Sequence, residues 1–272
     1  MPISADENRF ESDASRYAEY LATPEGRLRA DLSFENLREF LPTSAQTGLL
    51  RALDLGGGTG VAAVRLATLG IHVTLLDSSA KMLELARRAI VEAGVSEKVA
   101  CKLGDVTQLT ALCDPRSFDI VLCHNLLEYV DDPPAVLGGI ASIMRDSSAI
   151  LSILVRNQAG EVMKAALQAG DLDAAERNLT SAWAKESLYG GQLRLFTPQA
   201  LDTALTDASL TIKARRGVRV ISDYLPAQIS RSSDYERILA LEHKLGQRPE
   251  FYGVARYLQC LACLEKRGLS AK

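Results

Sequence analysis

The chain has 272 residues, of which 47% are apolar and 24% are charged, which suits a globular protein with one large α/β domain. The net charge of −3 excludes a strong overall attraction to nucleic acid or to a membrane surface. The polar, acidic start lacks the apolar core of a signal peptide and no apolar run could span a bilayer, so we expect a soluble, cytoplasmic protein.

The first 45 residues are expected to form a helical cap. Two helices are predicted between residues 16 and 41, and the break between them falls at Pro24-Glu25-Gly26. Residues 46–156 then alternate between apolar strands and helices. The strands are predicted at 49–55, 71–77, 99–103, 118–123 and 149–155. Because these strands are apolar on both sides, the pattern predicts a mostly parallel sheet with helices on both faces.

The helix after the second strand shows the clearest periodicity. Serines stand at its start and Gly94 lies just beyond its end, as is typical of helix boundaries. The spacing predicts one buried face made of Met82, Leu85, Ala89 and Ala93.

Residues 157–195 interrupt the alternation, because they are helical in composition but poorly periodic. We expect them to form a helical lid inserted after the fifth strand. Residues 196–272 then complete a seven-stranded sheet, with a strand near 210–220 and a final strand within 255–266. Cys260 and Cys263 have C-x-x-C spacing, but the alternation of a strand sends them to opposite faces. We therefore interpret the five cysteines as structural thiols.

The stretch LDLGGGTG, residues 53–60, predicts a ligand site. It joins the first strand to the first helix, where open α/β sheets bind ligands beyond the carboxyl ends of their strands. Gly56, Gly58 and Gly60 permit backbone conformations and close contacts that a Cβ atom would forbid. The helix that follows offers unpaired N–H groups to a polar ligand.

Several ligands fit a glycine turn, and the sequence separates them only in part. A dinucleotide fingerprint G-x-G-x-x-G meets Val61 in one frame and Ala63 in the other, so neither frame has three glycines. Asp54 would repel a pyrophosphate but could orient a ligand that carries a cationic amine. A P-loop is excluded because no Gly-Lys-Ser/Thr follows. A glycine turn without any cofactor is the remaining alternative.

Asp54 and the glycines resemble the first motif of the class I S-adenosylmethionine-dependent methyltransferases. VTLLD, LGDV and FDIVLCHNLLEYV resemble the later motifs of that family, in the right order on successive strands. The resemblance implies a single Rossmann-like domain over 1–272, S-adenosylmethionine as cofactor and S-adenosylhomocysteine as product. It implies that the cofactor is bound by Arg29, Asp54, Gly56, Gly57, Gly58, Gly60, Asp77, Ser78, Met82, Asp105, Val106 and His124.

A narrower resemblance covers most of the chain. RFESDASRYAEYLATPEGRLR, GVRVISDYL and YERILALEHKLGQRPEFYGVARYLQ resemble the bacterial tRNA 5-carboxymethoxyuridine methyltransferases, which esterify the carboxylate of a modified wobble uridine. This resemblance implies that Arg29 contacts the carboxylate of the cofactor, Asp77 its ribose and His124 its far side. A small-molecule methyltransferase and a protein that binds S-adenosylmethionine without turnover are the alternatives.

The acceptor chemistry points to arginines rather than to a general base. An ionised carboxylate can accept a methyl group without losing a proton, so alignment supplies most of the acceleration. A permanently charged, forked cation suits the binding of such a carboxylate. Arg219 and Arg256 are the candidates, with Tyr224 and Tyr257 as stacking or hydrogen-bonding neighbours.

The partners predicted from the sequence are tRNA or a small carboxylate substrate. Residues 213–256 contain nine Lys or Arg against five Asp or Glu, which predicts a modest basic patch that would suit tRNA phosphates. His72 and His243 have no second ligand type at metal spacing, so no metal site is expected.

Overall fold

The structure is a computed structural model that describes residues 11, 13–41, 50–186, 190–226, 228–229 and 231–266. The strands are β1 (Arg51–Leu55), β2 (His72–Asp77), β3 (Val99–Leu103), β4 (Ile120–His124), β5 (Ile150–Arg156), β6 (Trp183–Lys185), β7 (Gln192–Arg194), β8 (Leu210–Val218) and β9 (Tyr257–Leu264). The α-helices are α2 (Ala14–Ala22), α3 (Pro24–Arg38), α4 (Val61–Thr68), α5 (Ala80–Glu92), α6 (Leu109–Leu112), α7 (Pro133–Ile143), α8 (Gln158–Met163), α9 (Leu172–Asn178), α10 (Pro198–Asp207), α11 (Tyr235–Gly246) and α12 (Pro249–Tyr252). Shorter turns are η2 (Ser96–Lys98), η3 (Val106–Gln108), η4 (Leu127–Tyr129), the π-helical η5 (Lys164–Gln168) and η6 (Ser222–Tyr224).

Seven strands form one sheet in the order β3-β2-β1-β4-β5-β9-β8. The first five strands of this order are parallel, and β9 runs antiparallel to both of its neighbours. The direction of winding reverses between β1 and β4, so the loops that follow these strands diverge and leave a crevice. This topology confirms the predicted Rossmann-like sheet and places the glycine turn at the reversal point.

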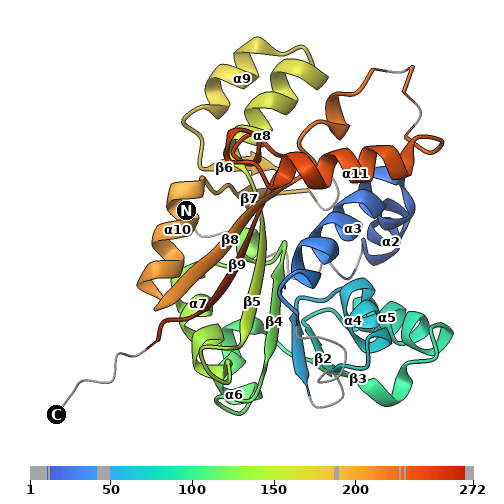
Figure 1. Cartoon of the computed structure of the whole chain (residues 1–272), viewed down its shortest axis with the longest axis vertical. Coiled ribbons are helices and arrows are strands. Elements are labelled where there is room, and N and C mark those ends of the chain that lie inside the picture. The colour runs from blue at the N-terminus through green and yellow to red at the C-terminus, as the bar shows by residue number, and fades with distance from the viewer. Residues whose placement is uncertain are drawn as a thin grey trace.

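Helices cover both faces of the sheet (Figure 1). On one face, α6, α7 and α10 pack on Leu53, Leu55 and Val121. On the other, α4, α5 and the end of α3 pack on Ala52 and Leu75. Because adjacent residues of β1 point to opposite faces, both sides of this central strand are buried, as the continuous apolar run predicted.

The predicted buried face of α5 was wrong in part. Met82 is buried, but Leu85 and Ala89 are only partly buried and Ala93 is exposed. The side chains that reach the core are Met82, Leu83, Ala86 and Ile90. Met82, Ala86 and Ile90, which are four residues apart, form the ridge of α5 that contacts the sheet. The sequence pattern did not identify Ala86 as part of this ridge.

The N-terminal cap lies against the C-terminal part of the chain (Figure 1). Thr23 caps α3 by accepting a hydrogen bond from the N–H of Gly26 at 3.1 Å, with Pro24 at the first helical position, as the predicted break requires. Leu28 and Leu32 of α3 pack with Val218 and with Tyr235 of α11. The expected boundary between residues 45 and 46 lies outside the described residues.

The segment inserted between β5 and α10 is helical only in its first half. It contains α8, η5 and α9, followed by the two-stranded antiparallel hairpin β6–β7. Figure 1 shows these elements gathered beyond one end of the sheet. The hairpin was not predicted; Gly190 and Gly191, both with positive φ, are the turn residues that helical composition concealed. In the part of the chain that is described, no helix combines the length and apolar character needed to cross a membrane.

Candidate active site

A cavity of about 520 Å³ opens at the carboxyl ends of the central strands. Its volume is within the range of small-molecule and cofactor sites. The cavity is lined by these residues predicted from the sequence: Arg29, Gly56, Gly58, Asp77, Ser78, Met82, Asp105, Val106, His124, Arg219, Arg256 and Tyr257. Asp54 and Gly57 line a smaller adjoining cavity of about 70 Å³, which shares Arg29, Gly56 and His124 with the larger one. Gly60 and Tyr224 line neither of these two cavities.

The glycine turn is folded tightly against its own strand, β1, and the neighbouring strand, β2. The N–H groups of Gly56 and Gly57 both donate to the carbonyl of Leu76, at 2.8 and 3.3 Å. A Cβ atom on Gly57 would lie 2.8 Å from the carboxylate of Asp54 and 2.8 Å from the side chain of Leu75. Gly58 has a φ of +54° and faces the cavity. A bare backbone is therefore required here both by packing beneath the turn and by the positive φ.

Asp77 connects the turn to the second strand. Its carboxylate accepts hydrogen bonds from the N–H of Gly58 and the N–H of Ser79, each at 2.8 Å. Each carboxylate oxygen has a further acceptor position, so these bonds orient the group without exhausting it. A carboxylate fixed in this way can accept the two hydroxyl groups of a ribose, as the family resemblance implies.

Asp54 is a buried carboxyl group beneath the turn. Burial and the neighbouring charge of Asp77 raise the pKa of Asp54 to about 7. Its Oδ2 atom has no hydrogen-bond partner among the described residues. Because a buried charge without a partner is costly, a cationic group bound nearby would stabilise the ionised form of Asp54.

Arg29 brings a buried positive charge to the same end of the cavity. It is only 7% exposed, and its guanidinium donates to the hydroxyl of Tyr17 at 2.8 Å. The rings of Tyr20 and Tyr257 lie 5.1 and 5.7 Å from the guanidinium carbon. Within the described ranges, Arg29 forms no ion pair with a carboxylate. The amino acid end of S-adenosylmethionine carries one carboxylate and one ammonium, so Arg29 and Asp54 fit this cofactor.

A chain of hydrogen bonds fixes the side chain of His124. The amide of Gln259 donates to the carbonyl of Ser33 at 2.9 Å and to the hydroxyl of Ser152 at 3.0 Å. The Ser152 hydroxyl lies 2.8 Å from Nε2 of His124 and can donate its proton there. Burial and the charge of Arg29 lower the pKa of His124 to about 3, so the ring is neutral. This arrangement leaves the Nδ1–H of His124 as the donor available to a ligand.

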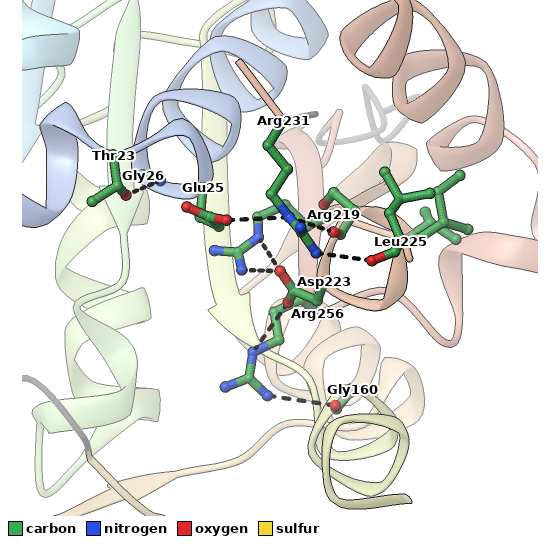
Figure 2. A network of polar contacts seen from close by, with 12 residues as sticks. Thr23, Glu25, Gly26, Gly160, Arg219, Asp223, Leu225, Arg231 and Arg256 are labelled. Carbon is green, nitrogen blue, oxygen red and sulfur yellow. Dashed lines mark hydrogen bonds and ion pairs between the residues drawn. The ribbon is translucent and has the colours of Figure 1, made fainter. Parts of the chain in front are cut away.

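Charged residues from distant parts of the chain gather around Asp223 and Glu161 in the same cavity, and we call this cluster the acceptor end. Figure 2 shows Asp223 between Arg219 and Arg256. The Nε and Nη2 atoms of Arg219 bond to Oδ1 of Asp223, and Nη1 donates to the hydroxyl of Tyr20 at 2.9 Å. The Nε atom of Arg256 lies 3.9 Å from Oδ2 of the same carboxylate. Arg219 and Arg256 are 7% and 4% exposed, so this group is almost entirely buried.

A second carboxylate extends this network to a third arginine. Glu161 of α8 pairs with Arg256 at 2.9 Å and with Arg156 at 3.1 Å. Arg156 also lies 3.6 Å from Glu186 of the inserted segment. The sequence analysis missed Arg156, although a charged residue that ends an otherwise apolar strand was a usable signal. It also missed Glu161 and Glu186, for which no local pattern gave a signal.

Glu128 is a further lining residue that the sequence analysis missed. Its carboxylate accepts hydrogen bonds from Asn125 at 3.1 Å and from the N–H of Arg156 at 2.8 Å, and burial raises its pKa. Glu128 and Asn125 both lie in the stretch that resembles the family motif after the fourth strand. The motif thus predicted the position of this wall of the cavity but not its buried carboxyl group.

Tyr257 lies where the sheet register brings the arginines together. It pairs with Arg156 on β5 and with Val218 on β8, immediately before Arg219. Burial alone would raise the pKa of Tyr257, but the guanidiniums of Arg156, Arg29, Arg219 and Arg256 outweigh this effect and lower it to about 7. Tyr224 is oriented differently: its hydroxyl is buried without a hydrogen-bond partner among the described residues.

Glu242 of α11 holds the loop that carries Arg219 and Asp223. This carboxylate is 0% exposed and accepts hydrogen bonds from three consecutive N–H groups, those of Val220, Ile221 and Ser222. Arg219 has a φ of +62°, which is unfavourable for a residue with a Cβ atom. The bonds to Glu242 stabilise this conformation and thereby aim Arg219 into the cavity.

The basic patch predicted in residues 213–256 is largely neutralised by ion pairs. Six of its nine cations, Arg215, Arg216, Arg219, Arg231, Arg237 and Arg256, form ion pairs. Four of these pair with carboxylates outside the segment, at Asp202, Glu39, Glu25 and Glu161. A count of charges within the segment could not include these partners. In the described part of the chain, no group of three or more His, Cys, Asp or Glu side chains could hold a metal ion.

Comparisons with known proteins agree with this geometry. A family model described as a methyltransferase domain matches residues 47–208. The chain is 30% identical over 262 residues to the tRNA 5-carboxymethoxyuridine methyltransferase of Escherichia coli (strain K12), a similarity that covers 94% of this chain and 96% of the relative. It is 34% identical over 122 residues to the ubiquinone biosynthesis O-methyltransferase of Xanthomonas euvesicatoria pv. vesicatoria (strain 85-10), covering 44% of this chain and 50% of that protein.

Solved structures support the fold. The S-adenosylmethionine-dependent methyltransferase from Mesorhizobium loti superposes with a TM-score of 0.57 at 19% identity, covering 89% of this chain and 98% of that one. The glycine turn, the Asp77 carboxylate and the buried Arg29 thus lie in a fold that is shared with S-adenosylmethionine enzymes. The chain belongs to the S-adenosylmethionine-dependent methyltransferases.

Proposed function

We propose that this methyltransferase esterifies a carboxylate, and that its acceptor is 5-carboxymethoxyuridine in tRNA. The observation that supports this most is the acceptor end, where Arg219, Arg256 and Tyr257 line the cavity that also contains the cofactor residues. Paired guanidiniums with fixed orientations suit the recognition of a planar carboxylate.

The extent of the similarity supports the same acceptor. The matched methyltransferase domain ends at residue 208, before the loop that carries Arg219 and Asp223. A similarity over 94% of the chain extends into this loop, whereas the ubiquinone biosynthesis relative matches only 44% of the chain. The segments that build the acceptor end are therefore included in the likeness to the tRNA enzyme.

The residues of the chain serve orientation more than proton transfer. S-adenosylmethionine supplies an electrophilic methyl group when bound, and an ionised carboxylate accepts it to give a methyl ester and S-adenosylhomocysteine. Arg29, Asp54 and Asp77 would hold the cofactor, while Arg219 and Arg256 would hold the acceptor carboxylate. Alignment of the two reactants can supply most of the acceleration.

The neutralised basic patch favours a second candidate, a small carboxylic acid. Binding of tRNA phosphates requires protein cations that are free to contact the phosphates and displace the counterions condensed on them. In the described part of residues 213–256, only Lys213, Lys244 and Arg248 form no ion pair with a carboxylate. A small acid would need the acceptor end but not a phosphate-binding surface.

Nucleoside analysis of tRNA tests the first candidate. Bulk tRNA from a strain lacking the gene is digested and the methyl ester of 5-carboxymethoxyuridine is measured by mass spectrometry. We expect the ester to be lost and to be restored when the purified protein and cofactor are added to that tRNA. Persistence of the ester in the deletion strain would contradict the tRNA assignment. Transfer of labelled methyl groups to a metabolite extract but not to this tRNA would favour the small acid.

A further inference from the structure

The first turns of the inserted segment are fixed against the acceptor end. Asn157, which caps α8, donates to the carbonyls of Gly253 and Ala255 at 2.9 and 2.8 Å. A Cβ atom on Gly160 would lie 2.6 Å from the carbonyl of Ala255 and 2.8 Å from Cα of Arg256. Helix α8 therefore packs directly on the backbone that carries Arg256, and this close contact requires glycine at position 160.

The helix continues as a π-helical turn, η5, at Lys164–Gln168. Such widened turns are rare and occur frequently at functional sites. Lys164 and Gln168, at the two ends of this turn, both line the large cavity. The turn thus adds a cation and an amide to the acceptor end, and neither residue belongs to a motif that the sequence analysis used.

Lys164 differs from the arginines of the acceptor end in its charge balance. Arg219 is paired with Asp223, and Arg156 and Arg256 share Glu161. A substrate anion must compete with these internal carboxylates for the guanidiniums. Lys164 is half-buried and, within the described residues, forms neither an ion pair nor a hydrogen bond through its ammonium group.

The charges around Lys164 leave its ammonium group poorly compensated. Burial lowers the pKa of Lys164, and Arg256 and Arg156 lower it further, against the opposing effect of Glu161 and Asp223. A bound anion would relieve this repulsion and restore the charged form. Among the described residues, Arg29 is the other cation of the cavity without a carboxylate partner, and it lies among the tyrosines of the cap, on the side assigned to the cofactor.

We infer that Lys164 binds the anionic group of the methyl acceptor and selects for a negatively charged acceptor, whereas the paired arginines orient that group. This inference rests on the proposed esterification of a carboxylate. It separates two tasks that the sequence had assigned together to Arg219 and Arg256. The inference implies a substrate with an anionic group small enough to pass the rim of the cavity and reach η5. This group can belong to a free acid or to a modified base.

Steady-state kinetics of Lys164→Gln test the inference. With saturating cofactor and tRNA from the deletion strain as acceptor, we expect the acceptor KM to rise about 10-fold while kcat stays within about twofold. The affinity for S-adenosylmethionine should not change. Lys164→Arg should restore most of the acceptor affinity, because it restores the charge. Lys98→Gln, in a turn at the opposite edge of the sheet, is the charge-matched control and should leave all three values unchanged.

Acetate provides a probe that does not depend on the natural acceptor. Acetate is titrated into protein saturated with S-adenosylhomocysteine and its binding is followed by heteronuclear NMR. We expect Lys164→Gln to weaken acetate binding about 10-fold and Lys164→Arg to restore it. If acetate binding depends on Lys164 but no carboxylate is methylated, the proposed function fails and the anion site stands. If an acid is methylated with the same KM in all variants, the inference fails and the proposed function stands.

Discussion

The two ends of the cavity are built in different ways. At the cofactor end, the glycine turn follows β1 and Asp77 ends the neighbouring strand β2, and the N–H of Gly58 donates a hydrogen bond to the Asp77 carboxylate. At the acceptor end, Arg156, Arg219 and Arg256 come from three segments and are joined through the side chains of Asp223 and Glu161. One end depends on local backbone geometry and the other on compensated charges.

This difference has a consequence for how each end tolerates substitution. Several hydrogen bonds stabilise the glycine turn, and no single side chain supplies all of them. Substitution of Asp77 should therefore weaken binding of the cofactor and leave binding of the acceptor unchanged. A buried network of alternating charges behaves as a unit, because removing one charge leaves its partner buried and unpaired. We therefore expect changes at the two ends to separate cleanly between the cofactor and the acceptor.

The largest effect is expected for Asp77→Ala. The substitution removes the carboxylate that orients the turn through Gly58 and Ser79 as well as the direct contact proposed for the ribose. We expect the dissociation constant for S-adenosylmethionine to rise by about 100- to 1000-fold, since each hydrogen bond to a charged group contributes about 1.5–3 kcal/mol. Isothermal titration calorimetry measures this.

Asp119→Ala is the matched control for Asp77→Ala. Asp119 also accepts a hydrogen bond from a backbone N–H, that of Arg51 at 2.9 Å, but it lies at the amino end of the sheet. This control should lower the thermal stability without weakening the cofactor. Equal losses of cofactor affinity in both variants would show that stability, not the turn, determines binding.

Arg219→Ala tests the other side of the comparison. The substitution leaves Arg256, whose Nε atom lies 3.9 Å from Oδ2 of Asp223, as the remaining ion-pair partner of Asp223 among the described residues. It also removes one of the guanidinium groups proposed to bind the acceptor. We expect kcat/KM for the acceptor to fall about 50-fold, in the range for truncation of one partner of a buried charge pair, with cofactor affinity within about threefold of the parent. Arg215→Ala, on the strand that precedes Arg219 but paired with Asp202 away from the cavity, should leave both quantities unchanged. A parallel loss of cofactor affinity in Arg219→Ala would break the division between the two ends.

Most of the residues expected to bind the cofactor line the cavities, and the sequence could bring them together because its signals there are local. Gly56 and Gly58 follow the first predicted strand and Asp77 ends the second, and parallel strands place their carboxyl ends at one edge. The alternation of strands and helices predicted a mostly parallel seven-stranded sheet, but it did not specify the order of the strands. Even here, Gly60 lines neither cavity and instead lies just before α4, at its N-cap position, with a φ of +81°.

The acceptor end was predicted only in part because its contacts depend on register and on distant partners. Arg219 and Arg256 were recognisable as candidates, but the carboxylates that neutralise them lie at Asp223 and Glu161, the latter in a segment without periodicity. The pairing of Tyr257 with Arg156 follows from the register of β9 on β5, which no single-strand pattern contains. Tyr224 shows the converse, because proximity in sequence to Asp223 did not bring its side chain to the cavity.

Glu242→Gln tests whether a residue outside the cavity positions the acceptor end. Glu242 does not line the cavity, but it accepts three backbone N–H groups of the loop after Arg219. The substitution replaces one acceptor oxygen by an NH₂ group, so we expect an acceptor KM about 10-fold higher and a loss of about 2 kcal/mol in the free energy of unfolding. Cofactor affinity should be retained. Glu236→Gln, an exposed position on the same helix, serves as the control, and an equal effect there would contradict the positioning role.

The smallest effect is expected in the pH dependence of acceptor binding. The pKa of Tyr257 is lowered to about 7 by the surrounding guanidiniums, despite its burial. An anionic acceptor competes with the phenolate for these cations, so acceptor binding favours the protonated phenol and raises its pKa. Affinity should therefore be highest below pH 7, and the acceptor KM should rise by about three- to fivefold between pH 6.5 and 8.5.

Tyr257→Phe should make the acceptor KM nearly independent of pH across this interval, because it removes the titrating phenol and keeps the ring. Asp54, whose pKa is also about 7, lies beneath the glycine turn, so its ionisation should act on the cofactor. Measurements at saturating S-adenosylmethionine separate the two groups. A pH dependence of the acceptor KM that persists in Tyr257→Phe would mean that another group controls the acceptor end. Loss of that dependence would show that the phenol and the acceptor share the same guanidiniums, as the register of β9 between β5 and β8 implies.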